Sequence, residues 1–209
     1  MGCLNSNVNN DDKTKNNTGN KVLIVCGPSG VGKDTLMSKV KDKKPAFFIK
    51  GVTHTSRQMR PGEAEGVNYY YVSEGRFLEM IDKGELIEHN YYNKNYYGLS
   101  KMSLMKGREY KDKIMYTIID INGAYSVYKL GIPAVYVAVL PKDEETLNQR
   151  LKGRGTESEE VIQGRLNTAK EELKRISETP FFNYRVINDN LESATEEMYN
   201  DLKKEYTFL

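Results

Sequence analysis

Runs of apolar residues alternate with segments of helical periodicity along most of the chain. The continuous runs Val22–Cys26, Ile114–Ile119 and Ala134–Leu140 predict strands that are buried on both faces. Further elements are expected as helices from Lys33 to about Lys43, Lys101–Lys106, Asp143–Leu151, Glu159–Ser177 and Glu192–Glu205, and as a strand near Arg185–Ile187. Strands that alternate with helices predict an α/β fold, with a parallel sheet covered on both faces.

The rhythm changes between residues 51 and 98, where the predicted strands are short. Strands are expected around Phe47–Thr53, over Val67–Val72, over Glu85–His89 and at Tyr96-Tyr97-Gly98. Ser73 is expected to cap a helix that ends at Gly84. We therefore predict a small subdomain inserted beside the carboxyl edge of the parallel sheet, where open α/β sheets bind their ligands.

Residues 1–20 are polar, rich in asparagine and without hydrophobic periodicity, which predicts a disordered tail. The tail begins with a pattern typical of myristoylation at Gly2, and Cys3 is placed for palmitoylation. Two acyl chains would hold the protein at a membrane surface, whereas an unmodified tail would leave it in the cytoplasm. The short pattern leaves both alternatives open.

The composition bounds the remaining possibilities. The 209 residues fit one domain, which we expect to be a monomer. The 31 basic and 29 acidic side chains nearly balance, so no global field favours nucleic acid. Cys3 and Cys26 make no disulfide framework and suit a reducing compartment. No apolar run approaches the ~20 residues that span a bilayer.

A glycine-rich segment follows the first predicted strand directly. It comprises Gly27, Pro28, Ser29, Gly30, Val31, Gly32 and Lys33. Glycines let backbone N–H groups curl around an anion, and the start of the following helix adds partial positive charge. The lysine would reach the β- and γ-phosphates, so strand, loop and helix together predict a nucleoside triphosphate site.

The two residues after this lysine are Asp34 and Thr35, where such loops usually continue with a serine or threonine that ligates Mg²⁺. A carboxylate at Asp34 is an acceptable ligand for Mg²⁺ brought by the triphosphate. Acidic residues are equally favoured at helix starts, so Asp34 would also suit a capping role.

A second anionic substrate is indicated by side chains of the inserted region. Two guanidinium groups and three hydroxyl groups there are suited to binding a phosphate. They belong to Thr53, Arg57, Arg60, Tyr69 and Tyr97. Each would also fit an ordinary structure, the arginines on a solvated loop and the tyrosines on a half-buried sheet face.

Two carboxylates, Glu88 and Asp120, supply acceptors near the same predicted edge. The adjacent N1–H and N2–H₂ donors of guanine would satisfy one of them through two parallel hydrogen bonds. Asp120 follows a buried strand directly, so it would also suit Mg²⁺ or its water, and the sequence leaves these roles open.

Three arginines, Arg150, Arg154 and Arg165, lie between or within the predicted helices around residue 155. Glycines on both sides of Arg154 indicate a hinged lid that delivers positive charge to a transferring phosphoryl group. Basic residues are also common at helix ends without any such role. His54 and His89 show no metal-ligand spacing, so zinc chemistry is not indicated.

Taken together, these segments resemble the guanylate kinase family over nearly everything from Lys21 onwards. The matching motifs are GPSGVGK (27–33), T-x-x-x-R-x-x-R-x-G-E (53–63), G-x-x-Y (66–69), L-I-E (86–88), N-Y-Y-G (95–98), D-I-N-G (120–123), R-L-x-G-R-G-T-E (150–157) and V-I-N-D (186–189). Several separated motifs in one order are far more specific than the glycine-rich loop alone.

The resemblance implies a P-loop three-layer parallel sheet core with an inserted small GMP-binding β subdomain and a helical lid. The core would comprise residues 21–50, 99–149 and 169–209, the GMP-binding region 51–98 and the lid 150–168. The implied activity is transfer of a phosphoryl group from ATP, with Mg²⁺, to GMP. By motif, GMP contacts fall on Thr53, Arg57, Arg60, Tyr69, Glu88, Tyr97 and Asp120. Phosphoryl-transfer roles fall on Lys33, Arg57, Arg154 and Arg165, and Asn188 lies near the adenine position.

Three positions depart from the family pattern. Asp34 replaces the metal-ligating hydroxyl, Leu99 replaces a hydroxyl that contacts guanine, and Ile118 replaces one of two acids at the strand end. Base choice is therefore less fixed than phosphoryl transfer. A kinase for another small phosphate, such as ribose 1,5-bisphosphate, and a catalytically silent guanylate kinase-like interaction module are the alternative functions.

Overall fold

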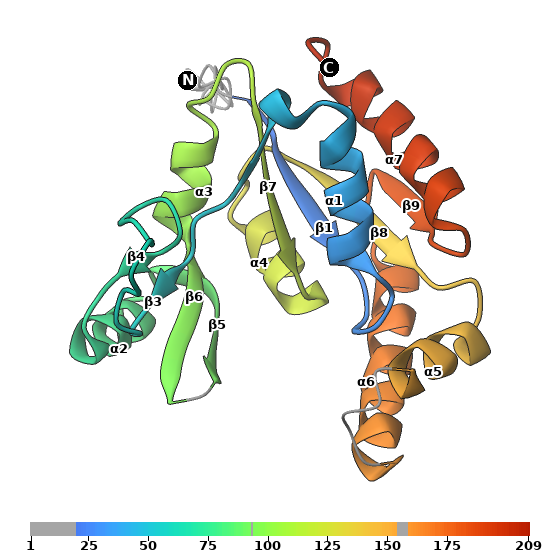
Figure 1. Cartoon of the computed structure of the whole chain (residues 1–209), viewed down its shortest axis with the longest axis horizontal. Coiled ribbons are helices and arrows are strands. Elements are labelled where there is room, and N and C mark those ends of the chain that lie inside the picture. Colours follow the sequence, from blue (N-terminus) through green and yellow to red (C-terminus); the bar gives the residue numbers. More distant parts are fainter. Residues whose placement is uncertain (1–19, 93, 154–158) are drawn as a thin grey trace, which may run out of the picture.

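The computed structural model describes residues 20–92, 94–153 and 159–209. Its core is a parallel sheet in the order β2-β7-β1-β8-β9. These strands are β1 (Val22–Cys26), β2 (Phe48–Lys50), β7 (Ile114–Ile119), β8 (Ala134–Leu140) and β9 (Tyr184–Ile187). The three apolar runs are strands with the predicted bounds, and the expected α/β class is confirmed (Figure 1).

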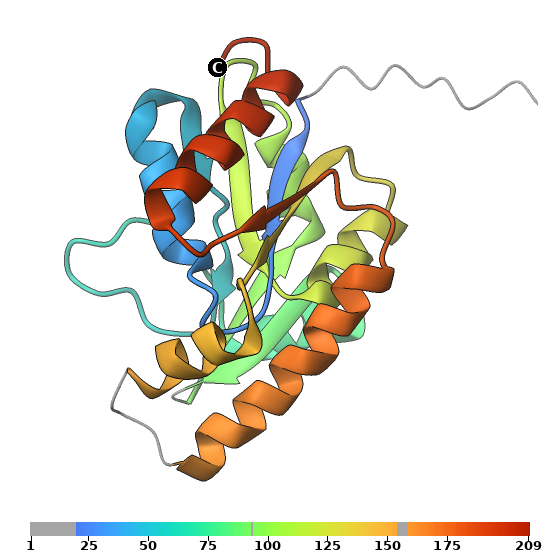
Figure 2. The same cartoon turned by 90° about the vertical axis from the view of Figure 1, so that its right-hand side faces the viewer.

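Helices cover both faces of this sheet, as Figure 2 shows. The helices are α1 (Lys33–Lys43), α3 (Lys101–Gly107), α4 (Ile121–Lys129), α5 (Glu144–Lys152), α6 (Glu159–Glu178) and α7 (Leu191–Glu205). Leu23 and Val25 of β1 pack with α1 and α7, whereas Val22, Ile24 and Cys26 pack with α3, α4 and α6. Successive strand residues point to opposite faces, so one short strand contributes to both halves of the core.

A smaller sheet in the order β4-β3-β6-β5 lies beside the core, on the left of Figure 1. It comprises β3 (His54–Thr55), β4 (Tyr70–Tyr71), β5 (Leu86–Tyr92) and β6 (Asn95–Ser100), with α2 (Glu74–Asp82) packed against β6. The Ser73 side chain accepts a hydrogen bond from the Arg76 amide, and Gly84 has a φ of 61° after the helix end. Both expected ends of this helix are therefore confirmed.

Three expected elements differ from the structure. The stretch predicted as one strand, Phe47–Thr53, is divided, because Phe47 ends a 3₁₀ turn and only Phe48–Lys50 pairs with β7. Within Val67–Val72 only Tyr70–Tyr71 is a strand, and Val67 is 71% exposed. The strand expected at Glu85–His89 instead runs to Tyr92 and forms a hairpin with β6.

Helix α4 was not expected from the sequence. The chain passes from β7 into α4 through Asp120 alone, whose carboxylate accepts a 2.8 Å hydrogen bond from the Gly123 amide. Asp120 directly follows a buried strand, and this strand end concealed its role as the cap of the next helix.

The structure bears on one of the two expectations about membranes, the spanning helix, but not on the acylation sites. Among the described residues, no helix combines the length and apolar character needed to cross a bilayer. Gly2 and Cys3, the expected acylation sites, lie outside the described residues. The boundaries given above for core, inserted region and lid stay predictions.

Candidate active site

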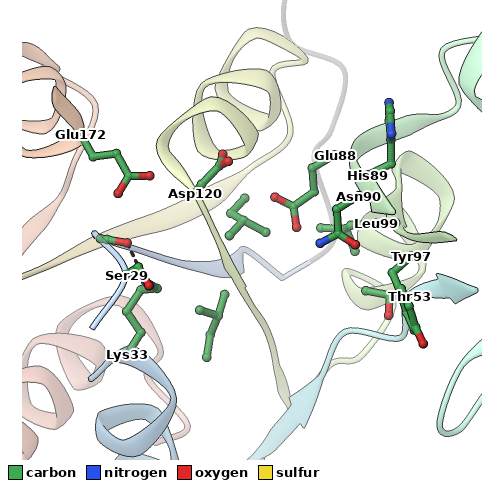
Figure 3. Close-up of a pocket in the computed structure, with 14 residues that line it drawn as sticks. Ser29, Lys33, Thr53, Glu88, His89, Asn90, Tyr97, Leu99, Asp120 and Glu172 are labelled. Atoms are coloured by element: carbon green, nitrogen blue, oxygen red, sulfur yellow. Dashed lines mark hydrogen bonds between the residues drawn. The ribbon is translucent and has the colours of Figure 1, made fainter. Parts of the chain in front are cut away.

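A cleft of about 470 Å³ separates the glycine-rich loop from the small sheet. Figure 3 shows Ser29 and Lys33 on one side, Thr53, Glu88 and Tyr97 on the other, and Asp120 between them. The lining residues are Gly27, Ser29, Lys33, Thr53, Glu88, His89, Asn90, Tyr97, Gly98, Leu99, Ile118, Ile119, Asp120 and Glu172. Residues predicted for both substrates thus line one cavity.

The loop between β1 and α1 has glycine at positions where another residue would clash or be strained. Gly27 has a φ of 152°, and a Cβ added there would lie 2.2 Å from the Val139 carbonyl oxygen. Gly32, which precedes α1, has a φ of 90°. The close approach to β8 and the left-handed turn together fix the loop beside the start of α1, an arrangement typical of anion binding.

Lys33 lies in the first turn of α1 and folds back over the loop. Its Nζ donates hydrogen bonds to the Gly27 and Pro28 carbonyl oxygens, at 2.6 and 2.9 Å. Burial lowers the pKa of this ammonium group, and the nearby carboxylates act in the opposite direction. The side chain is therefore partly desolvated within the cleft before any ligand contributes.

Two side chains from other elements donate hydrogen bonds to the backbone of this loop. The Nδ2 of Asn188, a buried side chain after β9, donates a 2.9 Å hydrogen bond to the Val31 carbonyl oxygen. Arg150 from α5 donates to the same oxygen at 3.3 Å. Asn188 does not line the cleft, so its predicted role near adenine stays a prediction, whereas its contact with the loop is a structural one.

Cys26 ends β1 directly before this loop. The thiol is fully buried, and burial raises its pKa to about 12. It is therefore protonated and acts as a small apolar residue beneath the loop.

Glu88 projects from β5 into the cleft. Burial raises its pKa to about 7, and the nearby Asp120 charge adds to the effect. The carboxylate of Asp120 is also used as the cap of α4. Near neutral pH, Glu88 is thus divided between its charged and neutral forms.

The arginines of the inserted region do not line the cleft. Arg57 Nη2 lies 2.7 and 2.9 Å from the two carboxylate oxygens of Glu63, and its guanidinium packs over the ring of Tyr69. Arg57 and the Arg60 amide together hold the pKa of Glu63 at about 2. The Arg60 side chain is exposed, and Tyr69 meets Tyr97 edge to face, 5.9 Å between ring centres. A chain of contacts thus joins Arg57 to the cleft through two tyrosines.

Three other predicted residues, among those that the structure describes, do not line the cleft. Asp34 and Thr35 are exposed in the first turn of α1, and the α1 cap position, Gly32, makes no side-chain hydrogen bond. Arg165 lies on α6 and is half-buried, while Arg154 lies outside the described residues. Their predicted roles stay predictions.

Glu172 lines the cleft, although no pattern in the sequence predicted it as a site residue. It lies on α6, where burial raises its pKa and the Lys33 charge opposes the rise. A glutamate in a charged helix carries no local signal, because Lys33, the charge that it lies near, is distant in sequence.

The hydroxyl that the family pattern places at position 99 is not replaced by that of the neighbouring Ser100. Leu99 is fully buried and lines the cavity, whereas the neighbouring Ser100 is turned away to cap α3 by accepting a hydrogen bond from the Ser103 amide. The departure noted in the sequence therefore leaves this part of the lining apolar.

A glycine-rich loop at the carboxyl edge of a parallel sheet, facing a pocket with carboxylates, defines a P-loop nucleotide-binding protein. Comparison with known proteins narrows the class. Residues 19–205 match the family model described as guanylate kinase. The chain is 41% identical over 175 residues to a guanylate kinase of Lactobacillus acidophilus, covering 84% of each chain. It is 38% identical to one of Hydrogenovibrio crunogenus, covering 86% of this chain and 85% of the relative.

Solved structures show the same relationship. A guanylate kinase from Anaplasma phagocytophilum matches with a TM-score of 0.58 and 25% identity, over 90% of this chain and 87% of that one. The SH3-kinase fragment of tight junction protein 3 shares the fold, with a TM-score of 0.51 and 10% identity over 91% of this chain and 59% of that one. The chain belongs to the guanylate kinase family.

Proposed function

We propose that the chain transfers the γ-phosphoryl group of ATP to GMP, giving ADP and GDP. The observation that carries this proposal is the shared cleft, in which Lys33 faces Glu88 and Tyr97. The relatives that cover most of the chain are named guanylate kinases, which supports the same reaction.

The triphosphate of ATP would lie on the amides of the glycine-rich loop, at the start of α1. Lys33 Nζ would exchange its carbonyl partners on Gly27 and Pro28 for phosphate oxygens. Mg²⁺ would enter with ATP as part of the substrate. Among the described residues no cluster of three or more histidine, cysteine or carboxylate side chains that could hold a metal ion occurs. Asp34 is the carboxylate we assign to that metal or its waters.

The guanine base would bind against Glu88. In its ionised form this carboxylate accepts hydrogen bonds from N1–H and N2–H₂, an arrangement that adenine does not offer. The GMP phosphate would be held by hydroxyl groups and arginines of the inserted region, Thr53, Arg57, Arg60, Tyr69 and Tyr97. Asp120 is the second acceptor we assign to the base.

The reaction needs positioning and charge neutralisation more than proton transfer. The attacking phosphate oxygen of GMP is already an anion, so no general base is required. Lys33, the arginines of α6 and its preceding segment, Arg165 and Arg154, and Mg²⁺ would offset the charge that moves to the leaving ADP. Closure of the lid over both nucleotides would exclude water, so that GMP rather than water accepts the phosphoryl group.

A coupled assay for ADP tests the proposal directly. ATP and Mg²⁺ are offered with GMP, dGMP, IMP, AMP and ribose 1,5-bisphosphate in turn, and we expect turnover with GMP to exceed that with AMP and the sugar phosphate. Turnover with the sugar phosphate but not GMP would support a different small-phosphate kinase. Binding of GMP without ADP formation would instead support a silent interaction module.

A further inference from the structure

Gly123 lies in the first turn of α4, where the helix packs against β5. An ideal Cβ built on Gly123 would lie 2.7 Å from Glu88 Oε2 and 3.3 Å from the Ile119 Cβ. Real Cβ atoms do not approach other atoms as closely as 2.7 Å, so a side chain at position 123 and the present position of Glu88 exclude each other. The Glu88 carboxylate therefore occupies space that a missing side chain leaves open.

The backbone gives no other reason for glycine at this position. Gly123 has no positive φ, and glycine within a helix is less favourable than alanine. Its amide donates to Asp120 Oδ1 at 2.8 Å, a bond that any residue except proline could make. Contact with Glu88 and Ile119 is thus the constraint that the structure shows.

We propose that Gly123 is a positioning residue for the acceptor: it provides the seat in which the Glu88 carboxylate is held against the first turn of α4, facing the base. The inference rests on the proposed function, because the seat matters for catalysis only if Glu88 reads guanine. It also relates the cap of α4, Asp120, to the seat at Gly123 in the first turn of the same helix. Asp120 fixes the start of α4, and the same turn then presents a bare backbone to Glu88.

The Gly123→Ala variant tests the seat. Since the new methyl group displaces Glu88, we expect KM for GMP to rise about tenfold or more, from loss of charge-assisted hydrogen bonds, while KM for ATP stays within twofold. The preference for GMP over IMP, which lacks the 2-amino group, should fall. An unchanged KM for GMP in a folded variant would overturn the proposal.

Gly75→Ala is the matched control. Gly75 lies in the first turn of α2, which like α4 has nine residues and a side-chain cap, but no atom lies within 4 Å of its Cβ position. We expect this variant to keep both KM values. A rise in KM for GMP in the control equal to that of Gly123→Ala would show that helix rigidity, and not the seat, is responsible.

A double variant keeps the test decisive if Gly123→Ala folds poorly. In the Glu88→Ala background the clash with the carboxylate is absent, so adding Gly123→Ala should leave KM for GMP unchanged. Equal effects of Gly123→Ala with and without the Glu88 side chain would overturn the proposal. This comparison also separates displacement of Glu88 from a direct effect on α4.

Titration of the Glu88 carboxyl carbon by NMR, without nucleotides, examines the seat independently of activity. Its pKa of about 7 should move in Gly123→Ala, because the carboxyl group changes its burial and its distance from Asp120, and should stay in Gly75→Ala. If the wild-type chain phosphorylates no GMP but this shift occurs, the seat stands and the proposed function fails. An unmoved titration in a folded Gly123→Ala variant overturns the seat itself.

Discussion

The glycine-rich loop and the opposite side of the cleft present different kinds of chemical group. On the loop side, the groups proposed for the phosphates are backbone amides, and Asn188 and Arg150 donate hydrogen bonds to the Val31 carbonyl oxygen of the loop. On the other side, side chains provide the polar groups, with Glu88 near its titration point and Arg57 bound to Glu63. The loop is thus preformed by backbone geometry, whereas the acceptor side depends on ionisation and on side-chain placement.

The largest expected effect is on the loop side. Lys33→Ala removes the charge proposed for the transferring phosphoryl group, so kcat should fall about 1,000-fold. GMP affinity, measured by calorimetry, should hardly change, since the other side of the cleft is untouched. Lys39→Ala, an exposed residue of the same helix, is the control. Persistent turnover in Lys33→Ala would remove the loop from the proposed mechanism.

The next effect addresses the acceptor side. Glu88→Gln replaces an acceptor by a group with two N–H donors, so KM for GMP should rise about 10- to 100-fold while KM for ATP stays constant. Exposed Glu109→Gln is the control. An equal rise in both KM values would break the division between the two sides.

Acidity provides a second test of Glu88. Burial raises its pKa to about 7, and guanine requires the ionised form, so KM for GMP should fall as pH rises from 6 to 8. The GMP phosphate itself titrates near ~6. In Glu88→Gln the GMP phosphate still titrates, so only the part of the pH dependence of KM that comes from Glu88 should disappear. A pH profile identical in both proteins would contradict the assignment.

A smaller effect is expected behind the loop. Asn188→Ala leaves the Val31 carbonyl oxygen without its 2.9 Å partner, which should lower the free energy of unfolding by about 1–2 kcal/mol. KM for ATP should rise more than KM for GMP, because the loop loses a support. Chemical denaturation and kinetics with exposed Asn200→Ala as control measure both. A rise in KM for GMP alone would contradict the prediction that Asn188 supports the glycine-rich loop.

The smallest effect is expected at Glu63. Its carboxylate holds Arg57 over the tyrosines, so Glu63→Gln, which keeps an oxygen acceptor but removes the charge of this half-buried pair, should raise KM for GMP about threefold. Glu74→Gln on α2 is the control. A lower KM for GMP would mean that Glu63 competes with the phosphate for Arg57 instead of positioning it.

The same contrast explains what the sequence could predict. The glycine-rich loop occupies seven consecutive residues between an apolar strand and a helix, so local pattern was sufficient. The apolar runs predicted β1, β7 and β8 for the same reason. Where function depends on the backbone, the chemistry and its signal lie in one continuous segment.

The acceptor side carries less local signal. Only Asp120 separates a buried strand from α4, which hid the cap of this helix, and the tyrosines of Val67–Val72 predicted a longer strand than the one that forms. Glu172 lies near Lys33, and Gly123 contacts Glu88, only because the fold brings together elements that are distant in sequence. Arg57 and Arg60 were predicted to bind the second substrate, but neither lines the cleft, and the partner that holds Arg57 could be found only in the structure.

Cys26 has a consequence for the handling of oxidative stress. With its pKa raised to about 12 by burial, almost no thiolate exists at neutral pH to react with peroxide or an alkylating reagent. Although a sulfur atom lies at the foot of the nucleotide loop, it offers no redox control there. Catalysis at this site should therefore be indifferent to thiol-directed inhibitors.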